Sequence, residues 1–145
     1  MENLTKKIVS TLKECLSIFT PSRYPKTFKS GHDLVNWLNQ NGIEYQDVLI
    51  FDNGDWKYED QQGFYHLIRN GVELTKGLKV KQVYSYDNGT WIFRDEQGFR
   101  HIYSDGIELT KGVNSREVFY INDGTWRYKD IEGNWHYFDK DNNPI

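Results

Sequence analysis

Residues 83–112 read VYSYDNGTWIFRDEQGFRHIYSDGIELTKG and contain one full copy of the pattern from which the fold is predicted. Asn88-Gly89, flanked by strand-forming residues, is the strongest short-range signal for a β-hairpin. The strand that follows, Thr90 to Asp95, alternates its side chains between two faces. The sequence DEQG at 95–98 then predicts a second turn. The stretch is therefore expected to form an antiparallel meander of three strands, with a short fourth strand at 107–109.

This pattern occurs three times, at a shift of about 35 residues. The predicted units are 47–81, 82–116 and 117–145. The first two also share the sequence Glu-Leu-Thr-Lys-Gly, which has no counterpart in the third. A single meander is marginally stable, so neighbouring copies are expected to share a buried face. The strands are compatible with an extended sheet, a sandwich or a barrel. The positions that are identical in all three copies include Gly54, Gly89 and Gly124; Trp56, Trp91 and Trp126; Asp60, Asp95 and Asp130; Gly63, Gly98 and Gly133; and His66, His101 and His136.

Residues 1–46 differ in kind from the repeats. Apolar residues recur at helical spacing between Leu4 and Phe19, which predicts an amphipathic helix that Pro21 ends. A second helix is expected near 30–42. The apolar face of this segment should cap the first repeat. The expected fold is therefore mainly β with an N-terminal α-helical cap (α+β), with a cap segment at 1–46 and a three-repeat β domain at 47–145.

The composition excludes several classes of partner. The net charge is -3, with 18 basic and 21 acidic residues interspersed, so neither nucleic acid nor an anionic membrane is an expected partner. No cofactor motif is present. Cys15 is the single cysteine, which rules out an intramolecular disulfide. No apolar run reaches the roughly 18 residues of a membrane span. The N-terminus lacks the pattern of a signal peptide, so a cytoplasmic protein is expected.

The repeat pattern Asn-Gly-x-Trp, then Asp-x-x-Gly, then an aromatic strand resembles the aromatic hairpin repeats of bacterial WG-type and cell-wall-binding proteins, which bind glucan or choline. The resemblance covers residues 47–145. It implies β-hairpins rich in exposed rings and a carbohydrate-type ligand. A shorter stretch, residues 23–38 with Arg23-Tyr24-Pro25 and Trp37-Leu38, resembles part of the DEP domain, and we interpret this likeness as coincidental.

The repeated histidines and aspartates have two interpretations. Three imidazoles can hold a divalent ion, which makes His66, His101 and His136 weak metal candidates. In a linear array, however, equivalent positions lie a full repeat apart, so a structural role on a strand is favoured. The aspartates beside glycine suggest acid–base chemistry, but their ability to bond to their own backbone in turns explains them better. No catalytic residue is predicted.

Aromatic side chains are the favoured binding residues. They make up 16% of the chain and occupy both faces of several strands, which a small sheet cannot bury everywhere. Exposed Trp and Tyr favour recognition of proteins or sugars. A two-layer packing that hides most rings is the alternative. The predicted binding residues are Trp56, Trp91, Trp126, Tyr58, Phe93, Tyr128, Trp135 and Tyr137.

The leading hypothesis is a non-enzymatic module that binds another protein, as an inhibitor or adaptor, through an aromatic sheet face. The Lys/Asn/Tyr/Ile-rich composition is typical of AT-rich bacterial, phage or mobile-element genomes, where anti-defence and immunity proteins are common. A carbohydrate-binding repeat protein is the first alternative. An enzyme that uses the repeated His and Asp positions is the second. Open strand edges at Asn142–Ile145 are also compatible with a homodimer.

Overall fold

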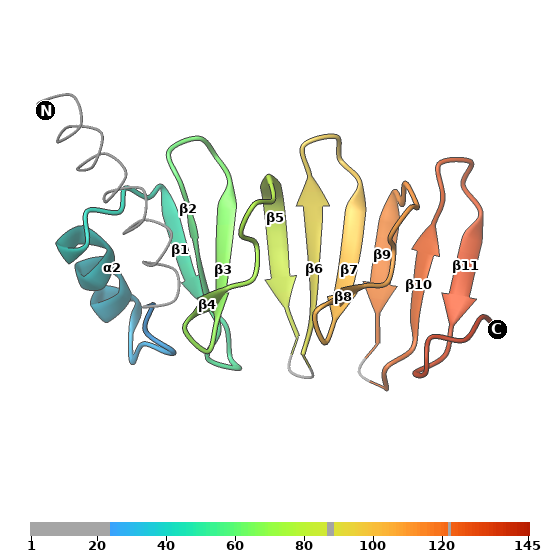
Figure 1. Cartoon of the computed structure of the whole chain (residues 1–145), viewed down its shortest axis with the longest axis horizontal. Helices are drawn as coiled ribbons and strands as arrows, with labels where there is room; N and C mark the ends of the chain where they lie inside the picture. The colour runs from blue at the N-terminus through green and yellow to red at the C-terminus, as the bar shows by residue number, and fades with distance from the viewer. Residues whose placement is uncertain (1–23, 87–88, 122) are drawn as a thin grey trace, which may run out of the picture. The chain divides into compact units, whose positions relative to one another are not determined.

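The computed structural model describes residues 24–86, 89–121 and 123–145, and within these ranges the chain forms one helix and eleven strands (Figure 1). The first predicted helix and Cys15 lie outside the described residues. The described helix, α2, runs from Gly31 to Gln40. The predicted mainly β fold with a short N-terminal helix is confirmed.

Helix α2 begins and ends where its sequence requires. The Ser30 side chain accepts a hydrogen bond from the backbone N–H of Asp33 at 3.2 Å, which caps the first turn. Leu34 and Leu38 are one helical turn apart and fully buried. The helix ends before Gly42, whose φ of 69° suits a residue without a side chain.

The strands form three antiparallel sheets, one in each repeat, with the strands in chain order within each sheet (Figure 1). The first holds β1 (Asp47–Ile50), β2 (Trp56–Glu59), β3 (Tyr65–Arg69) and β4 (Val72–Glu73). The second holds β5 (Val80–Ser85), β6 (Thr90–Asp95), β7 (Arg100–Ser104) and β8 (Ile107–Glu108). The third holds β9 (Glu117–Tyr120), β10 (Trp126–Lys129) and β11 (Trp135–Phe138). The short fourth strand predicted at 107–109 is confirmed by β8. None of these three described sheets closes into a barrel.

The repeated aspartates hold the turns. Asp95 Oδ1 accepts the backbone N–H groups of Gln97 and Phe99 at 2.9 and 3.0 Å. Gly98 has a φ of 90°, a conformation that residues with a side chain avoid, which explains the glycine of the Asp-x-x-Gly turn. Asp139 makes the same pair of bonds to backbone N–H groups, and Asn142 with a φ of 65° stands in the glycine position. The turn therefore occurs once more after the third sheet.

The residues after this last turn pair with β11. Phe138 and Pro144 form an isolated antiparallel bridge, and the N–H of Ile145 donates to the carbonyl of Tyr137 at 3.0 Å. The Asn142 side chain accepts a hydrogen bond from the Trp126 indole at 2.8 Å. The edge at Asn142–Ile145 that was expected to be open is thus partly paired.

The chain separates into two compact units. Among the described residues, the first comprises Tyr24–Asp60 and His66–Lys76. Its core joins α2 to the first sheet: Leu34 and Leu38 pack with Trp56, Tyr58 and Ile68. The Trp56 indole also donates a hydrogen bond to the carbonyl of Pro25 at 3.0 Å. Helix α2 therefore covers one face of the first repeat, as its apolar pattern predicts.

The second unit comprises Gln61–Tyr65 and Gly77–Ile145. Its core is formed by facing side chains of two sheets, Ile92 and Ile102 from the second and Val118 and Trp126 from the third. Burying an aliphatic side chain such as Ile102 contributes roughly 1.5–3 kcal/mol to stability. Neighbouring repeats of this unit share a buried face, as expected for a repeat protein.

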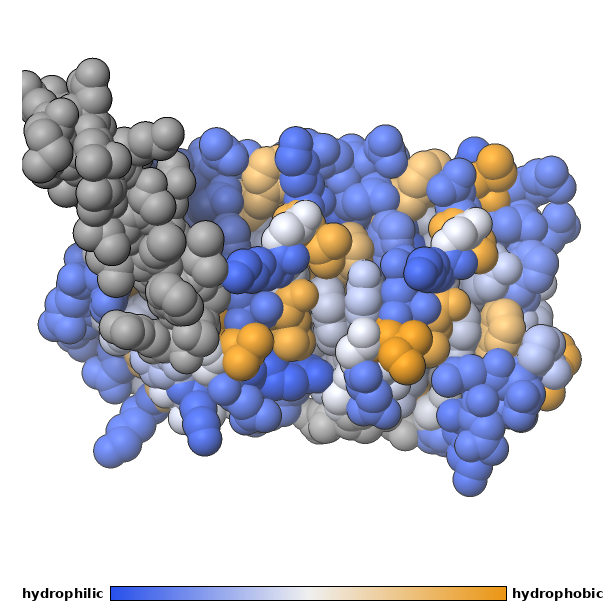
Figure 2. Space-filling model, viewed as in Figure 1, coloured by the Kyte–Doolittle hydropathy of each residue, from blue (hydrophilic) through white to orange (hydrophobic). Residues whose placement is uncertain are grey.

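In Figure 2 the visible face is mostly hydrophilic, with hydrophobic residues in small separate groups. Among the residues that the structure describes, no helix has the length and apolar character needed to cross a membrane.

Candidate functional site

The eight aromatic residues predicted to bind a partner divide into a buried and an accessible group. Five of them, Trp56, Tyr58, Trp91, Phe93 and Trp126, are at most 6% exposed. They alternate along β2, β6 and β10, so that in each repeat they share one inward face with the histidine. Their rings stack there, for example Trp91 on Tyr103 with centroids 4.6 Å apart. We therefore assign these five rings to packing and not to a binding surface.

The remaining three are accessible to different degrees. Tyr128 is half-buried beside the core of the second unit. Trp135 is half-buried and Tyr137 is 43% exposed, and both lie on β11. The accessible predicted rings thus come from one sheet, the third.

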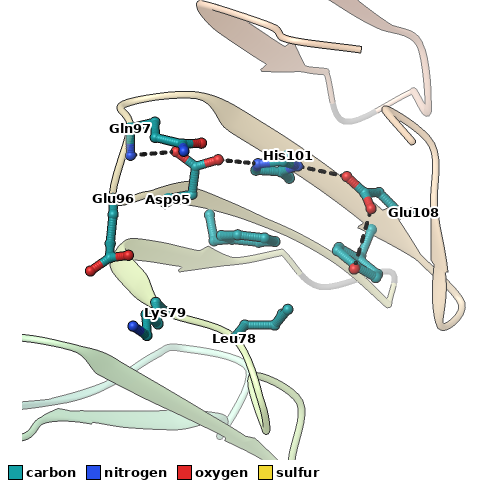
Figure 3. A pocket seen from close by; sticks show the side chains of 9 residues that line it. Leu78, Lys79, Asp95, Glu96, Gln97, His101 and Glu108 are labelled. Carbon is teal, nitrogen blue, oxygen red and sulfur yellow. Dashed lines mark hydrogen bonds and ion pairs between the residues drawn. The ribbon is translucent and has the colours of Figure 1, made fainter. Parts of the chain in front are cut away.

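Each repeated histidine forms part of a hydrogen-bonded clasp. In the second repeat, His101 Nε2 lies 2.8 Å from Asp95 Oδ2 and Nδ1 lies 2.6 Å from Glu108 Oε1 (Figure 3). The ring stacks on Phe93 with centroids 4.5 Å apart. Thr110 Oγ1 donates to Glu108 at 3.3 Å and accepts the backbone N–H of Ile102 at 3.2 Å. The clasp therefore ties a turn, β7 and β8 together.

The first repeat has the same clasp and the third has half of it. His66 lies 2.8 Å from Asp60 and 3.1 Å from Glu73. His136 lies 2.9 Å from Asp130, and no second carboxylate of the described residues bonds to it. In the first two repeats, the shared Glu-Leu-Thr sequence supplies the second carboxylate and the threonine of the clasp, and the third repeat lacks this sequence. This role was not predicted from the sequence.

The clasps shift the pKa values of their members. Burial lowers the pKa of His66, but the hydrogen bonds to Glu73 and Asp60 outweigh it, so the pKa lies above its usual value. Burial raises the pKa of Asp95, but the hydrogen bonds from His101 and two backbone N–H groups outweigh it and lower the pKa. The bond from His136, with those from the N–H groups of Asn134 and Glu132, lowers the pKa of Asp130 to about 2.

This geometry does not suit a metal or a general base. Carboxylate oxygens approach the His66 and His101 nitrogens directly, which leaves no room for an ion about 2.0 Å from each donor. Each clasp histidine bonds within its own sheet, and no group of three His, Cys, Asp or Glu side chains suited to a metal occurs in the described ranges. Both ring nitrogens of His66 and His101 also bond to carboxylates, so neither nitrogen is free to accept a proton from a substrate.

A shallow cavity of about 260 Å³ lies beside the second clasp (Figure 3). Asp95, His101 and Glu108 form one side of it, and Leu78 and Lys79 lie opposite. Because the side chains of Asp95, His101 and Glu108 are already bonded to one another, this side of the cavity presents few unsatisfied groups to a ligand.

A second candidate site lies on the face of the third sheet that is turned away from the second sheet. We call it the cation–aromatic face and define it by Phe119, Arg127, Lys129, Trp135 and Tyr137. Phe119 is 46% exposed, and the side chain of Tyr137 is similarly accessible. Arg127 pairs with Phe119 on one side and Tyr137 on the other in the strand register, so the three side chains lie side by side.

Two cations of this face share one ring. The guanidinium carbon of Arg127 lies 4.6 Å from the centroid of Trp135, 5.0 Å from that of Phe119 and 5.9 Å from that of Tyr137. Lys129 Nζ lies 5.5 Å from the same Trp135 centroid. Such cation–π contacts contribute about 0.5–1 kcal/mol each when exposed. Arg127 Nε is buried without any hydrogen-bond acceptor among the described residues.

Comparisons with known proteins assign no family. No protein-family model matches the chain, and no curated protein matches its sequence. Among solved structures, the chain is similar to one described as "YCF48 bound to D1 peptide", with 11% sequence identity and a TM-score of 0.42. That alignment covers 68% of this chain and 37% of the other.

Phe119, Arg127 and Lys129 were not predicted as site residues. Arg127 and Lys129 carry no aromatic ring, which was the basis of the predicted binding residues, and all three positions differ between the repeats. Arg127 is equivalent to Lys57 and Ile92, and Phe119 to Leu49 and Tyr84. A comparison of the differences between repeats, face by face, would have drawn attention to Arg127.

Proposed function

We propose that this chain is a non-enzymatic protein-binding module that contacts its partner through the cation–aromatic face of the third sheet. Such a module acts by occupying a surface of its partner, as an inhibitor or an adaptor. The observation that carries the proposal is the accessibility of Phe119 and Tyr137, whose rings make cation–π contacts with the guanidinium of Arg127. Tyr, Trp and Arg are the residues most enriched in binding hot spots.

The repeat architecture supports the choice of this face. In the second unit, the equivalent face of the second sheet presents Ile92 and Ile102 and is covered by the third sheet. The third sheet presents Arg127 and Tyr137 in their place. The two sheets share one backbone arrangement, but the face of the third sheet has an arginine and an aromatic ring where the second sheet has isoleucines. Such a face suits a partner with polar and apolar groups close together.

Carbohydrate binding has less support. That hypothesis requires equivalent rings of the three repeats to contribute equally, but the equivalent tryptophans Trp56, Trp91 and Trp126 are buried. Catalysis by the repeated histidines has less support as well, because the clasps engage their nitrogens.

Affinity capture tests the proposal. The purified chain is immobilised, exposed to lysate of its source cells, and the retained proteins are identified by mass spectrometry. The test variant is Phe119→Ser with Tyr137→Ser, and the control is Val72→Ser with Ile107→Ser, which changes two apolar residues that are 53% and 66% exposed elsewhere.

We expect one protein to be retained by the wild type and by the control and to be lost from the test variant. Circular dichroism and urea unfolding establish that both variants stay folded. Equal retention by the two variants would contradict the proposal, since the partner would then bind elsewhere.

A further inference from the structure

The cation–aromatic face has an unbalanced charge. It carries two cations, Arg127 and Lys129. The neighbouring strand β9 contributes one acidic residue to this face, Glu117, which pairs with Lys129 in the strand register. In the part of the chain that the structure describes, neither cation forms an ion pair with a carboxylate. Both cations also lie over one ring, Trp135. Two like charges on one ring repel each other, and an anion bound between them would remove that repulsion.

The cation–π contacts of Arg127 limit the directions from which an anion can approach. A guanidinium lying over rings keeps its N–H donors in its own plane, and planar N–H pairs match the two oxygens of a carboxylate. The rings of Phe119 and Tyr137 on either side exclude water and strengthen such a bond.

The surroundings select the source of the carboxylate. Because the rings of Phe119 and Tyr137 are exposed, a partner that covers them must carry apolar groups next to its carboxylate. The net charge of -3 disfavours a long polyanion such as nucleic acid. A protein segment that alternates acidic and apolar side chains meets both requirements.

A second copy of the chain fits the face poorly. A two-fold dimer through this face would bring two sets of Arg127 and Lys129 together. In a head-to-tail contact the partner copy would have to offer the stacking face of its first sheet, and α2 already covers that face in its own unit.

Resting on the proposed function, we infer that the cation–aromatic face binds an acidic linear segment of its partner protein, with an Asp or Glu carboxylate on Arg127 and Lys129 and apolar side chains on Phe119 and Tyr137. The carboxylate sets specificity, and the rings supply contact area. The affinity decreases as salt increases, because ionic screening weakens the exposed charges.

Selection from a phage-displayed library of random 12-residue peptides on the immobilised full chain tests this inference. The selected peptides are then measured by fluorescence anisotropy against two variants. One is Arg127→Gln with Lys129→Gln. The other is Lys76→Gln with Lys111→Gln, which removes the same charge from two exposed, equivalent positions of the first two repeats.

We expect the selected peptides to be enriched in Asp or Glu beside apolar residues. Their affinity should fall roughly 10- to 100-fold in the Arg127/Lys129 variant, as for the loss of charge-assisted hydrogen bonds. The Lys76/Lys111 variant should bind like the wild type.

Three results would overturn the inference. Selected peptides without acidic residues that bind both variants equally would show that the face needs no carboxylate, and the proposed function would stand on the capture experiment. A library that yields no binder would exclude a linear segment. A dimer of the free chain in sedimentation analysis that Tyr137→Ser abolishes would place a second copy on the face.

Discussion

The second and third sheets use one repeat pattern for different purposes. On the second sheet, Ile92 and Ile102 are 6% and 0% exposed because the third sheet packs against them. On the third sheet, the equivalent residues are Arg127 and Tyr137, and Tyr137 is 43% exposed. The backbone register is the same in both sheets. One repeat frame therefore carries a packed apolar face on the second sheet and a face of a cation and accessible rings on the third.

Exchanging these side chains should have the largest effect. Ile92→Arg places an unpaired charge in the core of the second unit, and we expect the free energy of unfolding to fall by roughly 4 kcal/mol. The reverse exchange, Arg127→Ile, should change it by less than about 1 kcal/mol. Urea unfolding followed by tryptophan fluorescence measures both. Similar losses from the two exchanges would mean that the two faces are equally buried.

The tryptophans of the third sheet offer a second comparison. Trp126 is 4% exposed and stacks on Phe138 with centroids 4.3 Å apart, so Trp126→Ala should lower the free energy of unfolding by about 3 kcal/mol. Trp135→Ala, on the opposite face of the sheet, should lower it by roughly 1 kcal/mol. Thermal unfolding of the two variants should show a clearly lower Tm for Trp126→Ala. A larger decrease for Trp135→Ala would contradict the assignment of the faces.

The complete clasp of the first repeat predicts a smaller, pH-dependent effect. Because the folded-state pKa of His66 is raised above that of the unfolded chain, its contribution to stability is full below about pH 6.5 and is lost as the pH rises through the folded-state pKa. An NMR titration should find the midpoint of His66 above 6.5, and His66→Phe should remove this part of the pH dependence. A midpoint at or below 6.5 would show that the carboxylates do not outweigh burial.

The half clasp of the third repeat predicts the smallest effect, at acidic pH. The pKa of Asp130 is about 2 in the folded chain, so its contribution is present above the unfolded-state value near 3.8 and is lost as the pH falls toward 2. Removing the His136 bond in His136→Phe should raise the pKa of Asp130, which carbon-13 NMR of the carboxyl group detects. An unchanged pKa would assign the shift to the backbone N–H groups alone.

Local pattern was enough to predict the meanders, the turns and helix α2. Asn-Gly and Asp-x-x-Gly act through backbone dihedrals and short-range hydrogen bonds, as at Asp95 and Gly98, and these do not depend on distant residues. The packing of one sheet on another was not predicted in detail, because it depends on which face of each strand meets a neighbour. The alternation of Trp91, Ile92 and Phe93 reads the same whether one face or both faces are covered, and here all three are buried.

The candidate site was predicted in part. Trp135 and Tyr137 were named for their rings, whereas Trp56, Trp91 and Trp126 were named by the same reasoning and lie in the core. An aromatic residue is equally typical of a core and of a binding surface, so composition alone does not separate the two. Arg127 is informative because an arginine stands at the position where the second repeat has the buried Ile92.

Site-specific photo-crosslinking tests the central claim, that the cation–aromatic face contacts a partner protein. A benzophenone amino acid replaces Tyr137 in one sample and Ile107, which is 66% exposed on β8, in the other. After irradiation in source-cell lysate, we expect a single crosslinked protein from position 137 and none from position 107. Crosslinking of the same protein from position 107 alone would place the binding surface elsewhere and contradict the claim.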